Sequence, residues 1–212
     1  MKSMLYKEFR LTIHPLFYLS FLFGALLLIP QWPYLIALMY FLFTIVPNIF
    51  STAKAQGDID FSASLPVRRG DIVKSRIWSI VIMQVLQVIV AAIFGAINLV
   101  LYPQGNFLMD TNAAFFGIVF VMYGLHNIAL FPMFYKTAFK IGIPTIVAVA
   151  VSVLFAGAIE TVIQIVPALK VLDGTLNTWV HYAALAGGIV IFVLLNLLAA
   201  KISVKRFEKV NI

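Results

Sequence analysis

The sequence has no cysteine and few charged residues, and each absence excludes a class of protein. Without cysteine, the chain forms no disulfide and no thiolate metal site. Only 11% of the residues are charged, whereas a soluble domain has roughly 25%, so an ordinary soluble globular protein is excluded. Three enzyme signatures are also missing: the HExxH zinc pair, the GxSxG nucleophile turn and the GxxxxGK(S/T) phosphate loop. We therefore expect no catalytic residue and no metal ligand, and if ATP drives this protein, another chain hydrolyses it.

Apolar residues are in excess, at 63% of the chain, and the mean hydropathy is +1.04. A helix needs roughly 20 apolar residues to cross the hydrocarbon core of a bilayer. Several such runs are present, which predicts an all-α membrane protein with a single domain over residues 1–212. An amphipathic segment at 1–15 is typical of an interface helix, and we expect 157–178 to be a re-entrant segment on the external side. The apolar runs predict six transmembrane helices, at residues 11–29, 34–50, 77–102, 113–131, 142–156 and 179–200.

The basic residues indicate how the chain is oriented. Fourteen of the 15 lysines and arginines fall in the N-terminal segment, residues 51–76, residues 132–144 and the C-terminal tail, and only Lys170 falls on the other side. Because lysine and arginine concentrate in cytoplasmic segments, both termini are expected in the cytoplasm. The net charge of +7 is then explained by topology. Membrane lipid is an expected partner, and no nucleic-acid partner is expected.

The longest polar interruption early in the chain is residues 56–76, which carry acids and bases around Pro66 and Gly70. Asp58 follows a glycine and is expected as the N-cap of a short helix. Pro66 is expected to end that helix, because the residue before a proline avoids the α region. We therefore expect a short cytoplasmic helix at 58–65 between the second and third spans; a solvated polar loop is the alternative.

Amide side chains form a stripe along the third predicted span. At 100° per residue, Gln84, Gln87 and Asn98 fall on one face together with small residues. Such a face contacts protein or water rather than lipid. Hydrogen bonding between helices and the lining of a transport pathway both fit the pattern.

Other polar residues within apolar runs have the same two interpretations. Thr145 and Ser152 lie at small-residue spacing in the fifth span, which favours a close helix or subunit interface. His126 and Asn127 lie in the fourth span, where a histidine either relays protons or bonds to a neighbouring helix. Glu160 is the only acid inside an apolar run, and its place near the external end favours an interfacial or loop-packing role.

Residues 64–76, Ser-Leu-Pro-Val-Arg-Arg-Gly-Asp-Ile-Val-Lys-Ser-Arg, resemble a motif of the ABC-2 type permease family of bacterial ATP-binding cassette exporters. In that family a short helix ends in Leu-Pro-Val-x-Arg, and an Ile-Val-x-x-(Lys/Arg) segment enters the third span. The resemblance extends to the layout of the whole chain. Within the family the chain looks most like permeases that export phenol-soluble modulins and antimicrobial peptides.

The resemblance implies a permease subunit in a bacterial plasma membrane, with two copies of an ATPase subunit that bind ATP and Mg²⁺. It also implies a second permease copy, either identical or a sister chain, and amphipathic or cytolytic peptides as cargo. The short helix would be the coupling helix that seats in the ATPase. The expected ATPase-coupling residues are Asp58, Ile59, Phe61, Ser62, Leu65, Pro66, Arg68 and Arg69.

Two other functions also fit the sequence. One is a membrane scaffold or immunity protein that binds a partner without transport. The other is a proton-driven carrier that uses His126 and Glu160.

Overall fold

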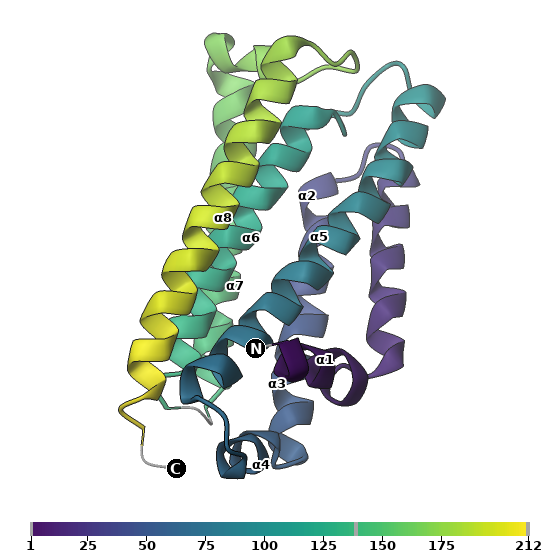
Figure 1. Ribbon diagram of the computed structural model, residues 1–212. Helices are drawn as coiled ribbons and strands as arrows, with labels where there is room; N and C mark the ends of the chain where they lie inside the picture. Colours follow the sequence, from purple (N-terminus) through teal and green to yellow (C-terminus); the bar gives the residue numbers. More distant parts are fainter. Residues whose placement is uncertain (1, 138–139, 211–212) are drawn as a thin grey trace.

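The computed structural model describes residues 2–137 and 140–210, apart from the side chain of Ile59, and in this part of the chain helices are the only regular secondary structure (Figure 1). Long helices stand side by side, and the short helices α1 and α4 lie together at one end, near both termini. The elements in chain order are α1 (Lys2–Lys7), η1 (Glu8–Thr12), η2 (Pro15–Leu28), α2 (Tyr34–Tyr40), η3 (Phe41–Ile45), α3 (Val46–Ala55), α4 (Asp58–Ser64), α5 (Arg69–Leu101), α6 (Ala113–Phe134), α7 (Gly142–Ile165), η4 (Pro167–Leu172) and α8 (Trp179–Phe207).

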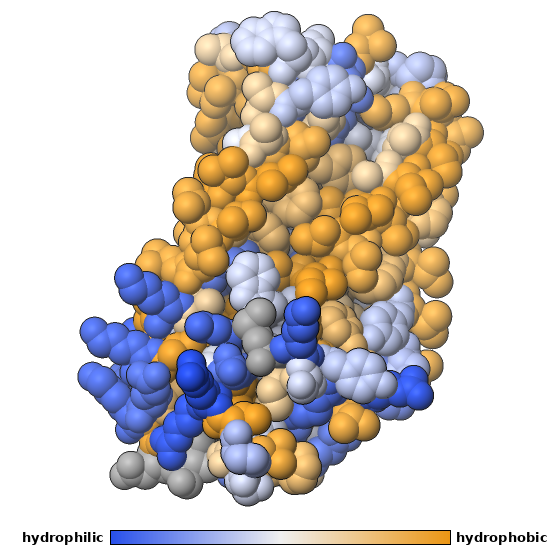
Figure 2. Space-filling model, viewed as in Figure 1, coloured by the Kyte–Doolittle hydropathy of each residue, from blue (hydrophilic) through white to orange (hydrophobic). Residues whose placement is uncertain are grey.

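Among the described residues, five helices are long and apolar enough to cross a membrane, and a bent pair raises the number to six. The five are Tyr34–Ala55, Arg69–Leu101, Ala113–Phe134, Gly142–Ile165 and Trp179–Phe207. Figure 2 shows the corresponding apolar band around the middle of the molecule, between two more polar ends. We call the end that carries α1, α4 and the C-terminal turns of α8 the basic end, and the opposite end the far end.

The first predicted span, 11–29, is not one continuous α-helix. The chain bends by 82° between Lys2–Thr12 and Pro15–Leu28. His14 is extended, with φ −63° and ψ 139°, because Pro15 follows it and excludes the α region. The 3₁₀ helix η2 rises about 2.0 Å per residue, so its 14 residues extend roughly 28 Å, close to the thickness of the hydrocarbon core.

The next span consists of α2, η3 and α3 in one run from Tyr34 to Ala55. Its middle turn, Phe41–Ile45, is a π-helix. Pro47 stands just after this turn and has no N–H to continue the α-helical ladder. A single wide turn beside such a position is a common way to accommodate the interruption.

Helices α5, α7 and α8 extend furthest beyond the predicted spans. Helix α5 has 33 residues and is about 50 Å long at 1.5 Å per residue, so its first two turns, which precede the predicted span 77–102, reach beyond a core of about 30 Å. Helix α8 continues through the predicted basic tail to Phe207. Helix α7 continues to Ile165, so Glu160 is on a helix rather than in a folded-back segment, and only residues 166–178 turn back.

Helices α6 and α8 approach each other closely at a pair of glycines. A Cβ atom on Gly188 would lie 2.2 Å from the carbonyl oxygen of Gly117, and one on Gly117 would lie 2.5 Å from the carbonyl oxygen of Ala184. Only glycine allows the two backbones to approach to this distance. This contact, one turn after the start of α6, holds α6 and α8 together.

The loops at the far end are joined by side-chain hydrogen bonds. Asn106 donates from Nδ2 to the carbonyl of Trp32 at 2.9 Å, and the backbone N–H of Asp110 donates to Asp173 Oδ1 at 3.0 Å. Asn112 caps α6 by accepting from the N–H of Phe115 at 3.0 Å, and its amide donates to the carbonyls of residues 172 and 174. Segment 166–178, which contains η4, is therefore fixed against the loop at 103–112.

Candidate functional site

Helix α4 is the short helix expected at 58–65, and it joins α3 directly to α5. The residue before it, Gly57, is in the left-handed region with φ 62°, where glycine has no steric cost. Gly57 is therefore the N-cap, and the expectation that Asp58 occupies that position was wrong. Asp58 is the first helical residue, and Leu65 ends the helix in extended conformation before Pro66.

The carboxylate of Asp58 is part of an ion-pair cluster that we call the Arg76 cluster: Lys7, Glu8, Asp58 and Arg76. Arg76 Nε donates to one carboxylate oxygen of Glu8, Arg76 Nη2 donates to the other at 3.2 Å, and Nη2 also donates to Asp58. Lys7 pairs with Asp58 and lies 3.5 Å from Glu8. Lys7 Nζ also donates to the hydroxyl of Ser62 at 2.7 Å. The cluster therefore ties α4 to the N-terminal segment and to the turns of α5 at the basic end.

The Arg76 cluster is charge-balanced and withdrawn from solvent. Its two acids and two bases cancel, and the side chain of Glu8 is fully buried while that of Arg76 is 4% exposed. Buried charges cost desolvation energy that a partner must offset, and removing one partner costs about 3–5 kcal/mol. The four side chains therefore act as a unit whose members depend on one another.

Aromatic rings connect the Arg76 cluster to the helices on the other side of the bundle. The Arg76 guanidinium carbon lies 5.9 Å from the ring centroid of Phe50 in α3, within range for a cation–π interaction. Ring contacts continue from Phe50 to Phe134 at 4.4 Å, to Tyr135 at 5.0 Å and to Phe207 in α8 at 5.5 Å. Burial raises the pKa of the Tyr135 phenol above its ordinary value, so its hydroxyl stays neutral. The cluster is thus in contact, ring by ring, with α3, α6 and α8.

The expected ATPase-coupling residues divide between two faces of α4. Ser62 is buried against Lys7, so it faces the Arg76 cluster rather than the surface. Phe61 is 57% exposed, which is unusual for an aromatic ring on a helix that does not cross the membrane, and Leu65 is half-buried. The side chain of Ile59 lies outside the described part. Pro66, Arg68 and Arg69 are exposed after the helix, and Arg69 donates to the carbonyl of Val210 at 3.0 Å.

The amide stripe of α5 is buried inside the bundle. Gln84 and Asn127 exchange two hydrogen bonds, at 3.0 and 2.7 Å, and Asn127 also donates to Asn196 of α8 at 2.8 Å. Gln87 accepts from the hydroxyl of Tyr123 at 2.6 Å. Asn98 donates to the carbonyl of residue 27 at 2.7 Å and to the hydroxyl of residue 34 at 2.8 Å. Of the two interpretations, these contacts match hydrogen bonding between helices.

His126 and the small polar residues of α7 are also buried between helices. His126 Nδ1 lies 3.2 Å from the hydroxyl of Ser152, which donates to the carbonyl of residue 148 at 3.0 Å. Thr145 lies two turns before Ser152 on α7, with its hydroxyl oxygen buried. Glu160 is eight residues after Ser152, about 12 Å along the helix axis. Within the described residues, no hydrogen bond connects His126 to Glu160.

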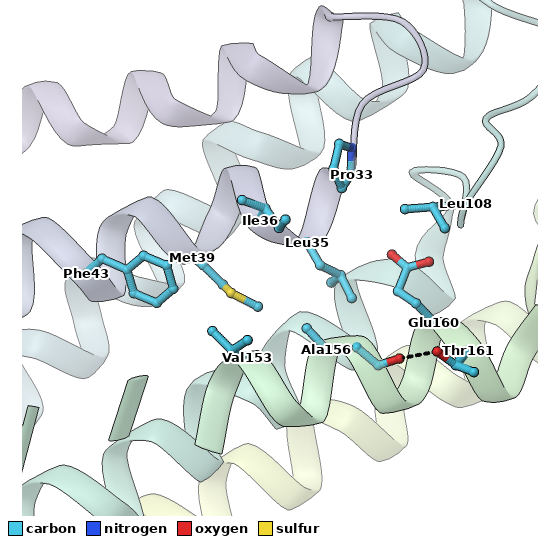
Figure 3. A pocket seen from close by; sticks show the side chains of 11 residues that line it. Pro33, Leu35, Ile36, Met39, Phe43, Leu108, Val153, Ala156, Glu160 and Thr161 are labelled. Carbon is cyan, nitrogen blue, oxygen red and sulfur yellow. Dashed lines mark hydrogen bonds between the residues drawn. The ribbon is translucent and has the colours of Figure 1, made fainter. Parts of the chain in front are cut away.

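Glu160 lies in an apolar groove between α7 and the α2–η3 run, near the far end (Figure 3). The groove has a volume of about 330 Å³, and Leu35, Met39 and Val153 are among the apolar side chains that line it. Glu160 extends from α7 toward Leu108, and its carboxylate accepts from the backbone N–H of residue 109 at 3.3 Å. The groove therefore presents one carboxylate against apolar walls.

Sequence reasoning missed three members of the Arg76 cluster. Lys7 and Glu8 had been assigned to an interface helix, and Arg76 had been noted only as part of the motif at 64–76. One signal was available: Glu8 is the only acid before Asp58. An acid beside a membrane interface needs a basic partner, and Arg76 stands next to the apolar part of α5.

The sequence model of the family described as "ABC-2 family transporter protein" matches residues 3–208. The chain belongs to the ABC-2 family of transporter proteins. As an ABC-2 protein it is a multi-pass membrane component of an ATP-binding cassette transporter, whose ATPase is a partner chain. No curated protein sequence and no solved structure matches this ABC-2 chain.

Proposed function

We propose that this ABC-2 protein is the permease subunit of an ATP-driven exporter of amphipathic peptides, including antimicrobial or cytolytic ones. The observation that supports it most is the attachment of α4 to the membrane helices through the Arg76 cluster. A helix joined in this way transmits a displacement instead of absorbing it. Family membership supplies the ATPase partner that would cause the displacement.

Helix α4 has the exposed side chains that a docking helix needs. Phe61 is exposed beside the exposed Ser64, at the end of the molecule where α1 and α4 lie (Figure 1). A single exposed aromatic ring is the kind of side chain that fills a pocket on a partner and dominates the binding energy. We propose that Phe61 and Leu65 seat in the ATPase, while Asp58 and Ser62 hold α4 to the permease.

Movement of α4 reaches the membrane helices by two routes. One is covalent, because α4 is separated from α3 by only two residues, 56 and 57, and from α5 by only four, 65–68. The other is the Arg76 cluster with its aromatic extension to α8. An ATPase shifts the permease only if it binds α4 differently in its two states, so we propose that ATP-dependent closure of the ATPase displaces α4 and tilts the spans on either side.

The groove beside Glu160 supports the proposed cargo class. Its apolar walls match the apolar face of an amphipathic helix, and its carboxylate complements a lysine or arginine on such a peptide. A strongly anionic or sugar-like cargo has neither the apolar face nor the cationic group that the groove complements. The groove lies at the far end, which we propose is the external side of a bacterial plasma membrane, with both chain termini in the cytoplasm.

We also propose that two permease chains, identical or sister, form the transport path above two ATPases. Helix α7 has large apolar side chains exposed along its length, including Ile146, Leu154 and Ile165. A second copy packed on this face would cover them and enclose the groove.

The test is co-purification of the tagged chain with candidate ABC ATPases, followed by reconstitution of the complex in liposomes. We expect a cationic amphipathic peptide to stimulate ATP hydrolysis and to be transported in an ATP-dependent manner. A scaffold protein would bind peptide without transport, and a proton-driven carrier would transport without ATPase and stop when a proton uncoupler is added.

Variants of α4 make the proposal sharper. We expect Phe61→Ala and Leu65→Asp to insert into the membrane at the wild-type level and to lose peptide stimulation of ATP hydrolysis, because they alter the proposed docking face. The matched control is Phe107→Ala, an equally exposed phenylalanine (57%) in the far-end loop. Wild-type coupling in both α4 variants would refute the proposed docking role.

A further inference from the structure

The last turns of α8 and the turn just after it carry three lysines that line a partly apolar groove. Lys201, Lys205 and Lys209 are four residues apart and line one groove of about 470 Å³. Lys201 and Lys205 share a face of α8, because residues spaced by four do so, and Lys209 follows just after the end of the helix at Phe207. The wall of the same groove continues toward the membrane through Leu198 and Ile202, and Leu198 is 47% exposed.

A second groove, of about 420 Å³, lies between the C-terminal end of α6 and the N-terminal end of α7. Lys136 and Lys140 supply its charge, and its apolar wall includes Ile143, which is 67% exposed. Arg206 lines both grooves, and its Nη1 donates to the carbonyl of Pro132 at 2.7 Å. Its guanidinium is therefore held in place between the two grooves.

The two grooves together concentrate positive charge in one region of the surface. Six bases line them, and among the described lining residues there is no carboxylate. Figure 2 shows hydrophilic side chains gathered over the lower end of α8, directly below the apolar band. The charge therefore sits where a membrane-spanning helix leaves the hydrocarbon region.

We propose that these grooves bind an anionic phospholipid of the adjacent leaflet, with its phosphate among the lysines and its acyl chains along the apolar walls. Basic pockets between transmembrane helices at the cytoplasmic side suit anionic headgroups. The combination of base and exposed apolar wall selects a lipid over other anions. A soluble phosphate would leave Leu198 and Ile143 uncovered, and an acidic protein surface could not reach into the hydrocarbon layer to cover them. This inference does not depend on the cargo or on the ATPase.

The experiment titrates the purified full-length chain, in neutral detergent micelles at fixed ionic strength, with fluorescent phosphatidylglycerol and with fluorescent phosphatidylcholine. We expect phosphatidylglycerol to bind saturably and phosphatidylcholine not to bind. The test variant carries Lys136→Gln, Lys201→Gln and Lys205→Gln. Each lysine near a headgroup contributes about 1 kcal/mol, or roughly fivefold in affinity, so the triple variant should bind about a hundredfold more weakly.

The control variant carries Lys2→Gln, Lys54→Gln and Lys170→Gln, which removes the same net charge from exposed positions outside both grooves. We expect it to bind phosphatidylglycerol within about threefold of wild type, since these lysines are outside the headgroup's reach. Equal weakening by both triple variants would overturn the site, because the effect would then be one of net charge. Full competition by soluble glycerol phosphate would also overturn it, in favour of a free anion. Wild-type lipid affinity in the groove variant, with loss of ATPase co-purification, would assign the grooves to a protein partner.

Discussion

Replacement of Arg76 by glutamine is the most informative single change in the Arg76 cluster. The guanidinium makes three hydrogen bonds to two carboxylates and lies over the ring of Phe50. Glutamine removes the positive charge and leaves the two acids with only Lys7. The carboxylate of Glu8 loses the most stabilisation, because its side chain is fully buried and the remaining cation, Lys7, lies 3.5 Å away.

The magnitude follows from the burial of the group. Removing one partner of a buried ion pair costs about 3–5 kcal/mol, because the other charge remains without compensation. The double variant Glu8→Gln with Arg76→Gln restores neutrality and keeps Lys7 paired with Asp58. We therefore expect the double variant to be more stable than the sum of the two single effects predicts, with a coupling energy of about 0.5–3 kcal/mol.

The assay is unfolding by a denaturing detergent in mixed micelles, followed by the fluorescence of the three tryptophans, of which Trp78 is on α5 near Arg76. Arg10→Gln is the matched control, because Arg10 is an exposed base of the same N-terminal segment and surface changes usually stay within about 0.5 kcal/mol. A loss at Arg76→Gln no larger than at Arg10→Gln would refute the reasoning. Additive effects in the double variant would show that Glu8 and Arg76 do not act as a unit.

Two further outcomes follow from the packing and from the far-end loops. Gly188→Val should destabilise the chain by about 1–3 kcal/mol, because its Cβ would lie 2.2 Å from the carbonyl oxygen of Gly117. Gly187→Val is the control in the same unfolding assay, since a Cβ at Gly187 would meet nothing within 4 Å. Equal effects of the two variants would contradict the close contact. Burial, opposed by a hydrogen bond from the backbone and reinforced by the charge of Asp173, raises the pKa of Asp110. The folded state then holds this proton more tightly, so the stabilisation is present below the ordinary pKa near 3.8 and is lost as the pH rises through the raised value. Asp110→Asn should remove this part of the pH dependence of the unfolding midpoint, and an unchanged pH profile would count against it.

The sequence was sufficient to predict the helical class and the presence of a short helix before Pro66. Apolar run length and the effect of proline on the preceding residue are local properties, and they operate in the chain as expected. Helix ends were less accurate. Helix α5 begins at Arg69, before the predicted start of the span at residue 77, and α8 continues through charged turns that were expected to be a tail. Lysine and arginine are good helix formers once a span has started the helix.

The contacts of the candidate site could not be predicted in this way. The Arg76 cluster joins residues 68 positions apart, Glu8 and Arg76, and nothing in the local pattern fixes that pairing. Ser62 was expected at a protein interface, and its contact with Lys7 depends on where the N-terminal segment lies. In contrast, the sequence predicts that Gln84 and Asn127 avoid lipid, and only the structure shows that they hydrogen-bond to each other.

The most direct test of the central claim uses the absence of native cysteine, since a single introduced thiol has no background. Ser64→Cys places a thiol on the exposed face of α4, and Leu176→Cys places one at the far end, where the side chain is 80% exposed. In membranes that contain the partner ABC ATPase, a short thiol-to-amine crosslinker should join the chain to the ATPase at position 64, with a yield that changes when ATP is trapped, and never at position 176. Crosslinking from position 176, or none from position 64 in an active complex, would contradict the claim that α4 receives the ATPase.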